Sequence, residues 1–192
     1  LQKAEKGSQA KGFVLPYGDS PFDDEPVGET VYMDILNRAK KYVHIMTPYL
    51  IIDQSMITAL TFAAKRGVDV KLILPHIPDK KFVFALAKSH YKELLKAGVR
   101  IYEYTPGFVH AKIFTSDDEK AVVGTINLDY RILYLHFECA AFLYQVEEIA
   151  EIEKDFQRTL EKCQEVTLEN RKKGTFFLRL EGWLLKWLAP LM

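Results

Sequence analysis

The sequence predicts an α/β fold in which a layered, mixed β-sheet is flanked by helices. Short runs of β-branched and apolar residues alternate with longer segments of helical period, which is typical of strands joined by covering helices. Two such runs, 108–116 and 120–123, are separated only by a short acidic turn, so we expect them to pair as a hairpin. The sheet is therefore expected to be mixed, and mostly parallel in its first half.

The expected elements are separated by residues that typically end strands or begin and end helices. Pro48 and Pro75 end two apolar strands, Asp53 is placed to cap a helix, and Gly67 and Gly98 follow helical stretches. The strands outside the hairpin are expected at 13–15, 42–47, 68–74, 99–104 and 137–144. The first of them is expected to end at the turn-rich segment 16–21. The helices are expected at 31–39, 53–66, 81–97 and 146–163.

Composition limits the class of protein. The chain has 192 residues, 48% of them hydrophobic, which is enough for the core of one domain. It carries 26 basic and 26 acidic residues, so no overall charge recruits nucleic acid, and we expect no nucleic-acid partner. Its two cysteines make no disulfide framework, which fits a reducing compartment. The first residue is Leu1, which suggests a piece of a longer protein.

The stretch 108–127 concentrates the chemistry of the chain. His110 and Lys112 are two residues apart in a run that reads as a strand, so their side chains are expected on one face. Two potential cations so close repel each other, so they need either a bound anion or a nearby carboxylate, and one phosphate would satisfy both. After the second strand, Gly124 permits close backbone approach, while Thr125 and Asn127 offer hydrogen-bonding groups. A core histidine beside a snorkelling lysine is the structural alternative.

The spacing H-x-K-x4-D-x6-G-T-x-N closely resembles the signature of the phospholipase D superfamily. The resemblance implies that His110, Lys112 and Asn127 hold a phosphodiester, with Thr125 beside them. It implies covalent or proton-transfer chemistry at His110, and a structural role for Asp117 within the catalytic motif. It implies neither a metal nor a cofactor, because lysine and asparagine donors stabilise the phosphoryl charge.

Glu138 is an isolated carboxylate in an apolar strand, where an unpaired charge is costly. The superfamily resemblance assigns it a catalytic role as the acceptor of a hydrogen bond from His110, which would fix the tautomer of the imidazole. The alternative is a salt bridge between Glu138 and either Arg131 or Lys112.

The outer segments narrow the resemblance to one subfamily. Thr47–Leu50, Gly67–Pro75, Leu94–Tyr104 and Asn127–Arg131, with Glu138, are similar to the C-terminal half of the bacterial cardiolipin synthase family. That family joins two phosphatidylglycerol molecules and releases glycerol through a phosphohistidine, at a site built from two copies of the motif. This chain has one copy, so the resemblance implies a second from the N-terminal half of the parent chain. Ile132 stands where the family usually has serine.

Several other functions remain open at this level. A phospholipase, a phosphatidylserine synthase or a dimeric nuclease of the superfamily would share the motif, and a homodimer of the chain would supply two copies. A non-catalytic module that binds lipid or a protein partner is the alternative from a different class.

The chain divides into three expected parts: a lead-in or linker at 1–12, a catalytic domain at 13–166 and an amphipathic helical tail at 167–192. In the tail, residues 175–189 place aromatic and leucine side chains on one side of a helical wheel, with two tryptophans suited to a membrane surface. Packing against its own domain, or against an absent one, is the alternative. By resemblance, the parent is expected at the bacterial cell membrane, with its catalytic domain on the cytoplasmic side.

Overall fold

The computed structural model describes residues 11–20, 22, 25–77, 79–129 and 137–169. Its main feature is an eight-stranded sheet with the strand order β1-β9-β7-β6-β2-β4-β5-β10. The strands are β1 Phe13–Asp19, β2 Tyr42–Met46, β4 Asp69–Pro75, β5 Arg100–Tyr104, β6 Ile113–Ser116, β7 Lys120–Gly124, β9 Glu138–Tyr144 and β10 Cys163–Val166. β2, β4 and β5 are parallel, and the other pairs are antiparallel, so the predicted mixed α/β sheet is confirmed.

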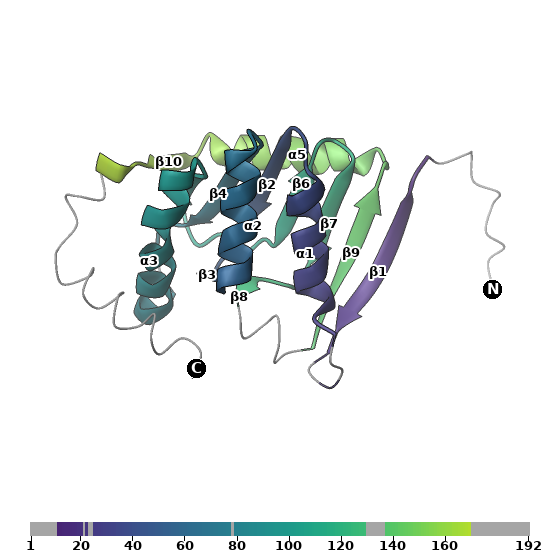
Figure 1. Cartoon of the computed structure of the whole chain (residues 1–192), viewed down its shortest axis with the longest axis horizontal. Coiled ribbons are helices and arrows are strands. Elements are labelled where there is room, and N and C mark those ends of the chain that lie inside the picture. The colour runs from purple at the N-terminus through teal and green to yellow at the C-terminus, as the bar shows by residue number, and fades with distance from the viewer. Residues whose placement is uncertain (1–10, 21, 23–24, 78, 130–136, 170–192) are drawn as a thin grey trace.

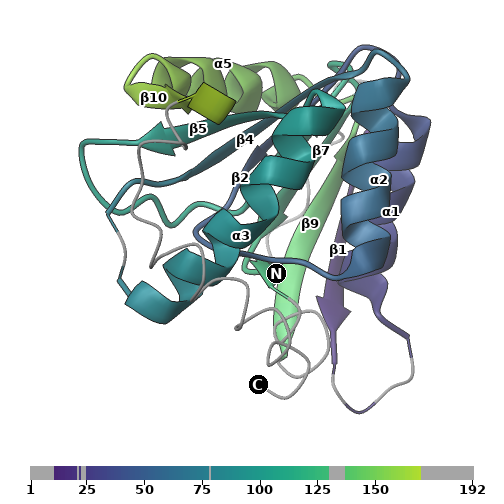
Figure 2. The ribbon, with the colours of Figure 1, turned by 60° about the vertical axis from the view of Figure 1, so that its left-hand side comes forward.

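Helices cover both faces of this sheet. Three of them, α1 Val27–Arg38, α2 Gln54–Lys65 and α3 Lys81–Ala97, stand side by side on one face (Figure 1). The fourth described helix, α5 Glu148–Leu160, crosses the opposite face, as the rotated view in Figure 2 makes plain. A short parallel pair, β3 Leu50–Ile51 and β8 Leu128–Asp129, lies outside the main sheet. None of the helices within the described ranges is long and apolar enough to cross a membrane.

Two residues that the sequence marks as helix boundaries act as predicted. The carboxylate of Asp53 accepts a hydrogen bond from the backbone N–H of Met56, 2.8 Å away, and caps α2. Gly98 follows the last residue of α3 and adopts φ 99°, the left-handed conformation that ends many helices. The main core fills the space between the sheet and the three helices, and a smaller cluster that includes Met46, Ile73 and Phe156 lies beneath α5.

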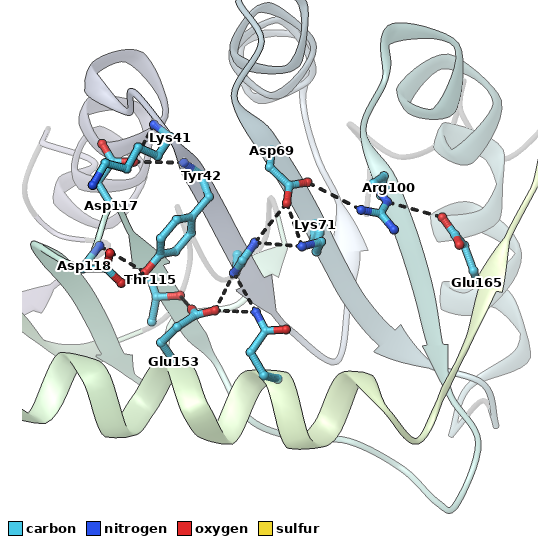
Figure 3. A network of polar contacts seen from close by, with 12 residues as sticks. Lys41, Tyr42, Asp69, Lys71, Arg100, Thr115, Asp117, Asp118, Glu153 and Glu165 are labelled. Atoms are coloured by element: carbon cyan, nitrogen blue, oxygen red, sulfur yellow. Dashed lines mark hydrogen bonds and ion pairs between the residues drawn. The ribbon is translucent and has the colours of Figure 1, made fainter.

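A polar network joins α5 to the sheet around the buried imidazole of His44. Its Nδ1 lies 2.8 Å from Glu153 of α5, and the second oxygen of that carboxylate accepts a hydrogen bond from Thr115. Figure 3 shows how the network continues along the sheet through Asp69 and Lys71 to Arg100. Burial raises the pKa of Glu153, but hydrogen bonds from His44, Thr115 and Gln157 outweigh it and lower the pKa overall. The network therefore holds α5 in one register on β2 and β6.

Asp117 fixes the hairpin of β6 and β7 to the start of β2. One of its oxygens accepts hydrogen bonds from the backbone N–H groups of Lys41 and Tyr42, and the other accepts one from Lys40, at 2.8–2.9 Å. Both Asp117 and Asp118 adopt left-handed φ values, 57° and 60°, which short polar side chains tolerate. The superfamily resemblance expected a structural role for Asp117, and these contacts agree with it.

Several expected boundaries are wrong. The first helix begins at Val27 and not at residue 31. The strand predicted to end before Pro16 continues through it to Asp19, because β1 is an edge strand and a proline there breaks no ladder hydrogen bond. The last helix ends at Leu160 and not at residue 163, since Cys163–Val166 pair with β5 as strand β10. The tail segment 175–189, Arg131 and Ile132 lie outside the described residues.

The Asp117 contacts predict a specific acid sensitivity. Burial raises the pKa of Asp117, but the three backbone donors outweigh it and lower the pKa below its usual value. A carboxylate with a lower pKa in the folded state stabilises the fold above its unfolded pKa of about 3.9, and that contribution is lost as pH falls through the folded value. Asp117→Asn, which exchanges one acceptor oxygen for a donor, should cost about 1–3 kcal/mol in urea unfolding at pH 7.

The matched control is Asp155→Asn on α5, whose carboxylate makes an exposed ion pair with Arg158 at 3.2 Å. It should change the free energy of unfolding by less than about 1 kcal/mol. Equal losses in the two variants would contradict the role of Asp117, as would unchanged acid sensitivity in Asp117→Asn.

Candidate active site at the sheet edge

The candidate site lies at the edge of the sheet where strand ends from its parallel and antiparallel parts lie side by side. The register places the last residues of β2, β4, β5, β7 and β1 beside the first residues of β6 and β9. Functional residues in open α/β sheets gather at such edges, as the sequence predicts here. Five of the six residues singled out from the sequence line one cleft of about 470 Å³ at this edge: His110, Lys112, Thr125, Asn127 and Glu138. The sixth, Asp117, lies at the opposite end of β6.

His110 and Lys112 precede β6 and are not part of it, which corrects the sequence expectation of a strand from 108. Strand β2 ends at Met46, opposite Ile113, and Pro48 lacks the N–H group that further pairing would need. The two side chains still lie together: the Nζ atom of Lys112 is 3.1 Å from Nδ1 of His110 and donates to the His110 carbonyl at 2.7 Å. The predicted proximity of the two groups is therefore confirmed.

The cleft holds its lysine in a partly desolvated position. Burial lowers the pKa of the Lys112 ammonium, and the nearby Glu138 carboxylate opposes this shift. The His110 side chain, by contrast, is exposed at the mouth of the cleft. A partly dehydrated ammonium beside an accessible imidazole forms a ready site for an anion, because a bound phosphate would favour the charged form of both.

Close backbone packing at the end of β7 places the next two residues. A Cβ atom on Gly124 would lie 2.4 Å from the carbonyl oxygen of Cys139 and 2.5 Å from Cα of Ala140, so only glycine lets β7 and β9 approach here. The side chain of Asn127 is 4% exposed, and its Oδ1 is buried without a hydrogen-bond partner among the described residues. Because Oδ1 is a hydrogen-bond acceptor, a phosphate oxygen would have to pair with the Nδ2 group of the same amide.

Glu138 makes a different contact from the one the sequence predicts. Among the residues that the structure describes, its carboxylate accepts a hydrogen bond from the Thr125 hydroxyl and not from His110. Thr125 in turn accepts a bond from the backbone N–H of Cys139 at 3.1 Å, so its hydroxyl is occupied by β9. Glu138 begins β9 and is half-buried, whereas His110 is on the loop before β6, with its ring beside Lys112. Glu138 and Lys112 both line the cleft, close enough for the carboxylate to raise the pKa of the ammonium.

Sequence reasoning missed Phe108 as a neighbour of the site. Its ring centroid is 5.9 Å from that of His110 and 6.2 Å from that of Tyr49. The signal was weak, because Phe108 is adjacent to the motif but Tyr49 comes from a distant part of the sequence. The Phe108 ring therefore lies between His110, which lines the cleft, and Tyr49.

The geometry suits the binding of a phosphate diester. Lys112 and Asn127 supply N–H donors for phosphate oxygens, and His110 supplies a nitrogen that can attack phosphorus or transfer a proton. Solved structures share this fold: the phospholipase D family member Nuc from Salmonella typhimurium has a TM-score of 0.69 over 81% of this chain and 99% of its own, at 16% identity. The fold is therefore that of the phospholipase D family.

The sequence comparisons identify the family within that fold. Residues 32–160 match the family model described as cardiolipin synthase, PLD-like domain, and the chain belongs to this family. It is 37% identical over 94% of its length to a cardiolipin synthase of Halalkalibacterium halodurans. An uncharacterized protein of Streptococcus mutans is 59% identical over 95% of the chain. The chain spans 36–40% of the length of these two relatives.

The glycine at the end of β7 allows a direct test of how the site is built. Gly124→Ala should force β7 and β9 apart, because its new methyl group would meet backbone and not a flexible side chain. We expect a loss of about 1–3 kcal/mol in urea unfolding and weaker binding of inorganic phosphate, followed through the NMR signal of His110.

Gly107→Ala is the control, since a Cβ atom there meets nothing within 4 Å. It should leave both stability and phosphate binding close to wild type. A Gly124→Ala protein with unchanged stability and phosphate affinity would contradict the packing argument.

Proposed function

We propose that this chain is the motif-bearing C-terminal part of a phosphatidyltransferase that makes cardiolipin and glycerol from two molecules of phosphatidylglycerol. The observation that carries the proposal is the convergence of His110, Lys112, Asn127 and Glu138 on one cleft. The match of residues 32–160 to the cardiolipin synthase family supports this substrate class over others that the fold accommodates.

The cleft has the groups needed to hold the phosphate of the lipid. Lys112 and Asn127 donate hydrogen bonds to the non-bridging oxygens, whose charge increases as the fifth bond to phosphorus forms. The Glu138 carboxylate opposes the effect of burial, which lowers the pKa of Lys112, and Thr125 holds that carboxylate in place. These donors replace the charge stabilisation that a metal ion gives in other phosphoryl-transfer sites.

Two histidines divide the chemistry. The nucleophilic histidine attacks phosphorus and forms a phosphohistidine, while the other protonates the departing glycerol oxygen. The second histidine then removes the proton from a hydroxyl of the second phosphatidylglycerol, whose oxygen displaces the nucleophile to give cardiolipin. We assign the acid and base role to His110, with the nucleophile on a second motif in the N-terminal part of a longer protein.

Both roles cannot be filled by His110 alone, because attack and departure occur on opposite sides of phosphorus. The second motif is therefore expected from outside these 192 residues. The proposed site of action is the surface of the bacterial cell membrane on its cytoplasmic side, where the substrate lies, with segment 175–189 as a membrane contact.

A chimera tests the proposal. The chain would replace the matching 40% of the Streptococcus mutans relative, and the purified chimera would be incubated with phosphatidylglycerol in mixed micelles. We expect cardiolipin and free glycerol in equal amounts, and a rate about 10²–10⁴ lower in His110→Ala. The isolated chain should form neither product.

The products of this assay distinguish the alternative functions. Phosphatidic acid without cardiolipin would indicate a phospholipase, and phosphatidylserine formed from added serine would indicate a different acceptor. Turnover by the isolated chain that rises with dimer concentration and disappears in His110→Ala would overturn the need for a second motif.

A further inference from the structure

The backbone of Asn127 is held on both sides by buried side chains. The carbonyl of the preceding residue, Ile126, accepts a hydrogen bond from the hydroxyl of Tyr32 at 2.8 Å. The backbone N–H of the following residue, Leu128, donates to the hydroxyl oxygen of Thr47 at 3.3 Å. The peptide groups before and after Asn127 are thus bonded to two side chains that come from distant parts of the sequence.

These two bonds matter because the side-chain oxygen of Asn127 does not anchor the amide. Its Oδ1 is buried without a hydrogen-bond partner among the described residues, although the side chain lines the cleft together with His110 and Lys112. The direction in which the amide points therefore depends on the backbone that carries it. A rotation of either neighbouring peptide group would turn Nδ2 away from a phosphate bound in the cleft.

Tyr32 is well placed to hold that backbone. Its side chain is 1% exposed, and its ring lies flat against that of Phe114, with centroids 3.9 Å apart and planes 5° from parallel. Phe114 belongs to β6, the strand that begins directly after Lys112. Burial raises the pKa of the Tyr32 phenol well above its usual value, so the hydroxyl remains a donor at neutral pH. Tyr32 thus fixes the loop of Asn127 relative to the strand that follows Lys112.

Thr47 holds the other side of the loop against the end of β2. Its side chain is buried, and its backbone N–H donates to the carbonyl of Ile73 in β4 at 3.1 Å. The hydroxyl that accepts from Leu128 also donates to the carbonyl of Tyr49 at 3.1 Å. The hydroxyl is therefore used both as donor and as acceptor, which fixes its orientation.

From these contacts we infer that Tyr32 and Thr47 are positioning residues of the phosphate site, which orient Asn127 so that its Nδ2 group and the Lys112 ammonium can bind one phosphate. The inference rests on the proposed function, and it adds two residues that are not among the described residues lining the cleft. The alternative is that both are ordinary core residues, whose loss would lower stability without a specific effect on phosphate binding.

Tyr32→Phe removes the hydroxyl and keeps the ring on Phe114. Inorganic phosphate would be titrated into the isolated chain and followed through the NMR signal of His110. We expect the dissociation constant to rise about 3–10-fold, the equivalent of one lost neutral hydrogen bond. Tyr91→Phe is the matched control, because Tyr91 is also a helical tyrosine, 1% exposed, whose hydroxyl is bonded to Glu103 at 3.3 Å. It should lower stability and leave the phosphate affinity unchanged.

Two substitutions of Thr47 separate hydrogen bonding from packing. Thr47→Val keeps the branched shape and removes the hydroxyl, whereas Thr47→Ser keeps the hydroxyl and removes a buried methyl group. A role in packing alone predicts the larger loss of phosphate affinity in the serine variant. The positioning role predicts binding about 3–10-fold weaker in Thr47→Val and within about twofold of wild type in Thr47→Ser.

A double-mutant cycle shows whether Tyr32 acts through Asn127. Asn127→Ala removes the amide donor and should weaken phosphate binding by at least about tenfold. In that background Tyr32→Phe should have less than about a twofold further effect, because the group that it positions is gone. An undiminished effect of Tyr32→Phe in the Asn127→Ala chain would show that Tyr32 acts by another route, and would overturn the inference.

The same titrations separate this inference from the proposed function. Loss of affinity in Asn127→Ala with none in Tyr32→Phe or Thr47→Val would keep the phosphate site and reject the positioning role. Unchanged affinity in both Lys112→Met and Asn127→Ala would reject the phosphate site itself and, with it, this inference.

Discussion

The carboxylate of Asp117 is the contact on which the arrangement of the site depends. It accepts three backbone hydrogen bonds from residues 40–42 and so fastens the hairpin of β6 and β7 to the start of β2. Strand β2 is the boundary between the parallel and antiparallel parts of the sheet. Because β6 has only four residues, fixing one of its ends also fixes the position of the other, where His110 and Lys112 enter the cleft.

The site combines a rigid frame with one accessible reactive group. Gly124, Thr125 and Asn127 are fixed by the close approach of β7 and β9 and by burial, and Glu138 is held by Thr125. His110 lies outside the strand and is exposed, so its ring is available to a substrate. The frame can thus position the hydrogen-bond donors for the phosphate oxygens, while the histidine ring can reach the phosphorus atom. Preorganised sites combine these two features.

Local signals in the sequence predict most of the fold. The predictions that are wrong concern features that depend on contacts between distant segments. The helix at Lys81–Ala97 is predicted closely, because the apolar period and Gly98 indicate the same segment. Strand β10 was missed since Cys163 continues the apolar period of α5 and only pairing with β5 makes it a strand. Motif spacing identified the residues that line the cleft. It gave no access to the Thr125–Glu138 contact or to Phe108 and Tyr49, which depend on segments far apart in the chain.

The most direct test of this account is a crystal structure of the chain with bound tungstate, an analogue of the phosphoryl group. The account predicts one ordered anion in the cleft, with an oxygen within about 3.2 Å of each of the His110 ring, Lys112 Nζ and the Asn127 side-chain amide. An anion ordered elsewhere, with none in the cleft, or His110 and Lys112 side chains on opposite faces of the sheet, would contradict it.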